Sequence, residues 1–111
     1  MSTVETSNGM SLDTRLLESY FNQMVGRFYK ILPIRETNPK TLEKYLRGMQ
    51  FDLIGFEDII VEIKYDSRYM SLINTVSNFI ERPNCNIETM RTEVFNSIDI
   101  CKQLAKKYRK A

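Results

Sequence analysis

Histidine is absent from this chain of 111 residues. Ser-His and Cys-His nucleophile pairs, HExxH zinc sites and imidazole acid–base catalysis all depend on that side chain, so the sequence excludes them. A phosphohistidine relay in a helical bundle is excluded for the same reason.

Glycine is scarce, and the four glycines are scattered at Gly9, Gly26, Gly48 and Gly55. Their spacing matches neither GxGxxG nor GxxxxGK[ST], and the nucleophile motif GxSxG is missing as well. We therefore expect no nucleotide bound in a glycine-rich loop.

Cysteine and long apolar runs are also scarce. Cys85 and Cys101 form no CxxC motif and no metal-site pattern, so we expect free thiols in a reducing compartment. No apolar run approaches the roughly 20 residues that span a bilayer, and the polar N-terminus lacks a signal-peptide core. The sequence predicts a cytoplasmic protein without a membrane partner, a cofactor, a bound metal or an identifiable small-molecule substrate.

The net charge of +2 is too small to indicate a nucleic-acid or membrane partner, but the charges are distributed in blocks. Residues 27–47 are mainly basic, residues 52–66 are mainly acidic, and residues 102–110 carry five basic side chains without an acid. The chain is therefore patterned basic, acidic, basic.

The apolar residues that are present recur at helical spacing. The strongest pattern is a four-three repeat of seven residues between positions 41 and 64: Leu42, Leu46, Met49, Leu53, Phe56, Ile60 and Ile63. Three further amphipathic stretches cover residues 12–32, 69–80 and 87–108. Four such helices with short connections predict an all-α, antiparallel four-helix bundle that forms a single domain over residues 11–111.

The N-terminal boundary is predicted from polarity. Residues 1–10 offer almost nothing to bury, so we expect a mobile, disordered tail. The first helix should begin under an N-cap from Ser11 or Asp13. Pro33 should end it, because proline disfavours helical geometry at the residue before it and clashes with the preceding turn.

The other boundaries follow from capping residues. Asn38 is a favoured N-cap, and Pro39 then takes the first helical position, where its missing N–H costs nothing. The apolar pattern changes phase near Asp66, which predicts a helix break there, with Asp66 or Ser67 as the cap of the third helix. Pro83 should end the third helix, and Asn86 should cap the fourth.

Two features of the second helix leave alternatives open. The β-branched residues within 59–63 would also suit a strand, although the helical pattern extends on both sides of them. Gly48 and Gly55 share a helix face, where they either let a neighbouring backbone approach closely or are merely tolerated.

The second helix also carries apolar residues outside its main seam, namely Phe51, Ile54, Val61 and Tyr65. A helix that is apolar most of the way round is central in its fold or covered by a partner. These residues predict a partner-binding stripe. The favoured function is a non-enzymatic interaction or assembly module that binds a protein, either a second copy in a homo-oligomer or another chain.

A nucleic-acid accessory protein is the first alternative. Cationic side chains at the end of the last helix could contact phosphates, and a tyrosine among them could stack on a base. The candidate residues are Lys102, Lys106, Lys107, Tyr108, Arg109 and Lys110.

A carboxylate-metal hydrolase is the second alternative. Asp58, Glu62 and Asp66 would align on one face if the helix continued that far, and magnesium favours such oxygen ligands. This arrangement resembles the all-α nucleotide pyrophosphohydrolases, but the ExxE and ExxD pairs of that family are missing. A solvated acidic face is the preferred interpretation.

Overall fold

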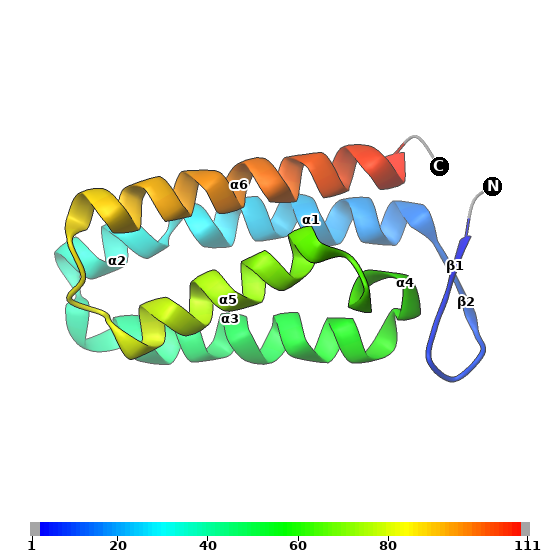
Figure 1. The fold of residues 1–111 in the computed structure, drawn as a ribbon, viewed down its shortest axis with the longest axis horizontal. Helices are drawn as coiled ribbons and strands as arrows, with labels where there is room; N and C mark the ends of the chain where they lie inside the picture. The colour runs from blue at the N-terminus through cyan, green and yellow to red at the C-terminus, as the bar shows by residue number, and fades with distance from the viewer. Residues whose placement is uncertain (1–2, 110–111) are drawn as a thin grey trace.

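The computed structural model describes residues 3–109, most of which are helical (Figure 1). The expected all-α class is confirmed in this broad sense, with a small two-stranded sheet in addition. The elements follow in the order β1 (Thr3–Glu5), β2 (Ser11–Asp13), α1 (Thr14–Tyr29), α2 (Ile31–Thr37), α3 (Pro39–Ile59), α4 (Val61–Lys64), α5 (Ser67–Glu81) and α6 (Ile87–Arg109).

The long helices pack in two pairs. Helix α6 runs along α1, and α5 runs along α3, while α2 lies at the end of the molecule opposite the hairpin (Figure 1). The apolar stripes of all four long helices meet in one core, in which Phe21, Leu46 and Tyr69 are fully buried. The three-four spacing of the apolar residues is what directs one face of each helix into this core.

The N-terminal segment differs from the disordered tail expected from its composition. Strands β1 and β2 pair antiparallel, with Val4 opposite Leu12, and Gly9 adopts a positive φ of 84° in the connecting turn. Val4 is buried and joins the hydrophobic core. Residues 1 and 2 lie outside the described part of the chain.

The hairpin is held by contacts with a distant segment. The backbone N–H of Ser7 donates to the carbonyl of Ile59 at 2.8 Å, and Thr6 forms an isolated antiparallel bridge with Ile60. Composition alone misjudged residues 3–10, because their order depends on tertiary contacts that a local pattern does not contain.

The first helix ends earlier than predicted. Helix α1 stops at Tyr29, with Lys30 as its C-cap, and Pro33 lies in the first turn of α2. A proline is tolerated there because the N–H groups of a first turn have no partner within the helix. The prediction that Pro33 ends the first helix is therefore wrong.

Most of the other capping predictions are confirmed. Asn38 directly precedes α3, but its side chain makes no capping hydrogen bond. Pro39 opens α3, and Glu81 is the last residue of α5, shortly before Pro83. The side chain of Asp66 accepts a hydrogen bond from the backbone N–H of Arg68 at 2.9 Å, which caps α5. Asn86 caps α6 by accepting from the N–H of Glu88 at 2.8 Å.

The segment around Ile60 fits neither interpretation of residues 59–63 in full. Helix α3 ends at Ile59, Ile60 is extended with φ −102° and ψ 109°, and the short helix α4 follows. The extended residue is the one that bridges to Thr6. The hairpin thus meets the chain where the predicted second helix is interrupted.

Candidate functional site

Helix α3 has one buried face and one face that points away from the core. Leu42, Leu46, Met49 and Leu53 are buried. At 100° per residue, the opposite side of the helix between positions 44 and 58 is occupied by seven residues, which we call the outer face of α3. They are Lys44, Arg47, Gly48, Phe51, Ile54, Gly55 and Asp58.

Two large apolar side chains stand at the centre of this outer face. Phe51 is 79% exposed and Ile54 is 43% exposed, so no described segment covers them. They line a shallow surface hollow together with Arg47, Gln50, Gly55 and Asp58. An apolar centre with charged residues at its rim is the composition of a protein interface.

Val61 and Tyr65 are exposed as well, at 41% and 80%, but they do not line this hollow. The extended backbone at Ile60 separates them from α3, so Val61 lies in α4 and Tyr65 directly follows it. The predicted stripe of four residues is therefore divided by the chain into one pair on α3 and another at α4.

The two glycines of the outer face border open space. A methyl group added at Gly48 or Gly55 would meet no atom within 4 Å apart from the helix itself and adjacent residues. Close approach of a neighbouring backbone to these glycines is thus not found within the described chain. Both positions remain accessible to an external partner.

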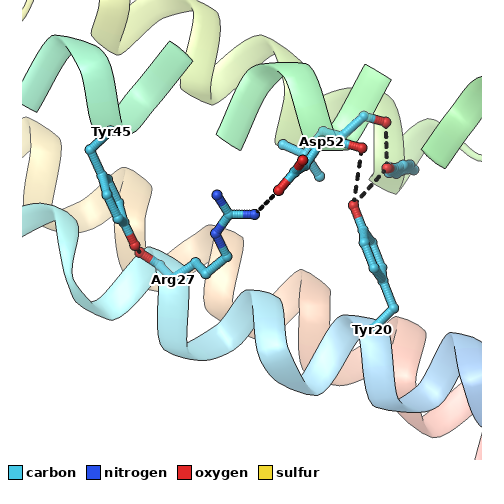
Figure 2. Close-up of polar contacts among 6 residues, drawn as sticks. Tyr20, Arg27, Tyr45 and Asp52 are labelled. Carbon is cyan, nitrogen blue, oxygen red and sulfur yellow. Dashed lines mark hydrogen bonds and ion pairs between the residues drawn. The ribbon is translucent and has the colours of Figure 1, made fainter. Parts of the chain in front are cut away.

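The inner side of α3 is fastened to α1 by polar side chains (Figure 2). The hydroxyl of Tyr45 donates to the backbone carbonyl of Arg27 at 2.8 Å, and the Arg27 guanidinium forms an ion pair with Asp52. The hydroxyl of Tyr20 reaches the backbone carbonyl of Asp52 at 3.5 Å. Contacts at several points along α3 fix which side of the helix faces outward.

Aromatic packing strengthens the same attachment. The ring of Tyr20 stacks on Phe56, with centroids 3.7 Å apart and an angle of 7°. The hydroxyl of Tyr69, on α5, donates to the carbonyl of Leu53 at 2.6 Å. Burial raises the pKa of Tyr20 to about 12 and also raises the pKa of Tyr69, so both hydroxyls stay protonated near neutral pH.

The cationic residues at the end of α6 lie in two different environments. Lys102 and Lys106 are exposed. The amine of Lys107 lies 3.6 Å from Glu62 and 3.7 Å from Asp66, and Arg109 lies 4.0 Å from Glu18. Lys110 lies outside the described residues.

Tyr108 does not fit the role that the nucleic-acid alternative gave it. Its side chain is 2% exposed, and its ring stacks on Phe21 with centroids 6.0 Å apart. A ring inside the core cannot stack on a base, so this assignment is wrong. The residue continues the apolar stripe of α6, which directs it inward.

The carboxylates of the metal alternative are not aligned on one continuous helix. The break at Ile60 separates Asp58 on α3 from Glu62 on α4, and Asp66 lies before α5. Glu62 and Asp66 both approach Lys107. Within residues 3–109, no three potential metal ligands of the His, Cys, Asp or Glu type come together.

The cysteines are free thiols, as expected. Cys101 is fully buried, and burial raises its pKa to about 12. Cys85 is half-buried, and its sulfur lies 3.9 Å from the Arg35 guanidinium.

Sequence reasoning missed one exposed aromatic pair. Tyr29 and Phe95 are 47% and 45% exposed and meet edge to face at 6.1 Å. Phe95 stands off the apolar stripe of α6, and the same kind of displacement from a stripe was the signal that pointed to Phe51.

No protein-family model matches the chain, and no curated protein or solved structure matches it significantly. None of the helices in residues 3–109 combines the length and apolar character that crossing a bilayer requires.

Proposed function

We propose that this protein is a non-enzymatic interaction or assembly module that binds a protein through the outer face of α3. The observation that carries this proposal is Phe51, a large apolar side chain that is 79% exposed on a helix otherwise firmly attached to the core. Desolvation of such an aromatic residue is a common source of binding energy at interfaces.

The scaffold suits this role because it presents the face without requiring it to reorganise. We propose that the four long helices act as an antiparallel four-helix bundle, a proposal supported by the packing of α6 on α1 and of α5 on α3. The polar contacts of α3 with α1 support a fixed orientation of Phe51 and Ile54. A preorganised face loses little conformational entropy on binding.

The two alternative functions have less support. Tyr108 is buried in the core and is therefore not available to a nucleic acid. Two of the cations of that interface, Lys107 and Arg109, already contact carboxylates of the same chain. A metal-dependent hydrolase would need carboxylates that the break at Ile60 separates. We therefore propose neither.

The test is a photo-crosslinking experiment in cells that naturally express the protein. A photoreactive phenylalanine analogue placed at position 51 is expected to form a defined adduct with a protein upon irradiation. The same analogue at Gln103, an exposed position on α6, is the control and should form no such adduct.

The adduct should also depend on the apolar neighbour. We expect Ile54→Asp to abolish it, because a charge next to Phe51 would have to be desolvated in the complex. Circular dichroism would verify that the variant is folded. A probe at position 51 that forms no adduct at all would contradict the proposed function.

A further inference from the structure

We infer that the partner of the outer face of α3 is a second copy of this chain, bound with its own α3 antiparallel and with the two-fold axis at Phe51. This inference rests on the proposed function, since it names the occupant of the same surface. It is carried by the arrangement of charge and side-chain size along the face.

Symmetry decides which residues would meet. In a two-fold dimer, the same patch of both subunits is used, and antiparallel helices with an axis at position 51 pair residues whose numbers add up to 102. Phe51 then meets its own copy at the axis, and Lys44 faces Asp58. The flank of the face that carries Gly48 and Gly55 meets the same flank of the other copy.

The charges support this register. Lys44 and Asp58 are both exposed and lie at opposite ends of the outer face, and neither forms an ion pair within residues 3–109. Pairing in the antiparallel direction joins these opposite charges twice, once on each side of the axis. A parallel pairing would place Lys44 against Lys44 and Asp58 against Asp58, which is repulsive.

The sizes of the side chains support the same register. Gly48 and Gly55 lie together on one flank of the face, and an added methyl group at either position meets no neighbouring segment of the chain. The two-fold axis brings Gly48 of one copy beside Gly55 of the other, where neither helix carries a side chain. Glycines on both sides of a contact let two helix backbones approach closely.

The size of the contact determines the expected strength. The segment from Lys44 to Asp58 is about 21 Å long at the helical rise of about 1.5 Å per residue. A contact confined to one helix from each copy is at the small end of specific interfaces, so we expect a dissociation constant of roughly 10 μM.

The experiment is sedimentation equilibrium of the purified full chain at low and moderate salt. The wild type should approach twice 13.1 kDa as concentration rises. Lys44→Glu and Asp58→Lys should each raise the dissociation constant about tenfold, because each places like charges together at both ends of the face. Phe51→Glu should raise it about a hundredfold or more.

A charge-swapped double variant and two control charge reversals test the register itself. The double variant K44E/D58K should return the dissociation constant to within about threefold of the wild type, because the pair is restored with its signs exchanged. The reversals Lys102→Glu and Asp99→Lys, at exposed positions on α6, are the matched controls and should leave the dissociation constant unchanged.

The glycines provide an independent check. Gly48→Ala should weaken the dimer, because the new methyl group would stand between the two helices where Gly55 of the other copy approaches. Gly26→Ala is the control, because Gly26 is also an exposed glycine in a helix with open space around it but lies on α1. It should leave dimerisation unchanged.

The outcomes separate this inference from the proposed function. A chain that remains monomeric at millimolar concentration overturns the homodimer, and a dimer unaffected by Phe51→Glu overturns the interface inferred for it. In that case an adduct between the probe at position 51 and a different protein would still support the proposed function. Failure of both the dimer and the adduct would overturn both.

Discussion

Two buried tyrosines show how differently the same side chain can be accommodated. The hydroxyl of Tyr69 donates to the carbonyl of Leu53 at 2.6 Å. The hydroxyl of Tyr108, buried to a similar extent, has no hydrogen-bond partner within the described chain. A buried polar group without a partner loses its hydration without compensation, so the two hydroxyls should affect stability with opposite sign.

Replacement of each tyrosine by phenylalanine tests this contrast. Tyr69→Phe should lower the free energy of unfolding by about 1 kcal/mol, because a buried hydrogen bond is lost. Tyr108→Phe should leave the free energy of unfolding unchanged or raise it by about 1 kcal/mol, because it removes an unsatisfied hydroxyl. Urea denaturation monitored by circular dichroism measures both, and a clear loss of stability in Tyr108→Phe would show that its hydroxyl is satisfied in solution.

At the residue scale, only part of the candidate site could be predicted from the sequence. The position of Phe51 and Ile54 off the apolar seam of their helix predicts partner binding, and both side chains are exposed. Val61 and Tyr65 were predicted to extend the same stripe, but the break at Ile60 moves them away from it. Periodicity identifies the side of a helix that a residue occupies only as long as the helix continues.

At the scale of elements, capping residues located several helix ends correctly. Asp66 and Asn86 each accept a hydrogen bond from a backbone N–H in the first turn of the following helix. Such side-chain caps act over two or three residues, so they can be recognised from the sequence. Pro33 was misjudged because a proline can end a helix or occupy a first turn, and the choice depends on where the preceding helix has already stopped.

The cap of α6 gives a prediction with a control in the same turn. Asn86→Ala should lower the free energy of unfolding by about 1 kcal/mol, because the N–H groups at the start of α6 lose their side-chain acceptor. Asn84→Ala changes an exposed residue outside the helix and should alter stability by less than about 0.5 kcal/mol. Equal effects of the two substitutions in thermal or urea denaturation would contradict the capping role.

At the scale of the whole molecule, burial keeps two tyrosine hydroxyls and one cysteine thiol protonated to a higher pH in the folded state than in the unfolded chain. Burial raises the pKa of Tyr20, Tyr108 and Cys101 to about 12, above the ordinary values of 10.0 for tyrosine and 9.0 for cysteine. The unfolded chain therefore releases these protons at lower pH than the folded chain. The stability that they contribute is fully present below the ordinary values and is lost as the pH rises toward the folded-state values.

We therefore predict that the protein unfolds in alkali. The free energy of unfolding should not depend on these groups near neutral pH. It should fall from about pH 9, where Cys101 ionises in the unfolded chain, to about pH 12, and each buried tyrosine adds up to about 1.4 kcal/mol per pH unit above pH 10. Thermal melts followed by circular dichroism over this range measure the effect. Tyr108→Phe should make the decline shallower, and an unchanged slope would contradict the burial of that hydroxyl.

The sequence by itself determined the helical class, the buried face of each long helix and most capped ends, because these depend on spacing and contacts within a few residues. The tertiary structure decided the rest. Residues 3–13 form a hairpin that docks on the end of α3, and α3 stops at Ile59, directly before the residue that bridges to the hairpin. Such outcomes depend on contacts between distant segments, which exist only once the chain is folded.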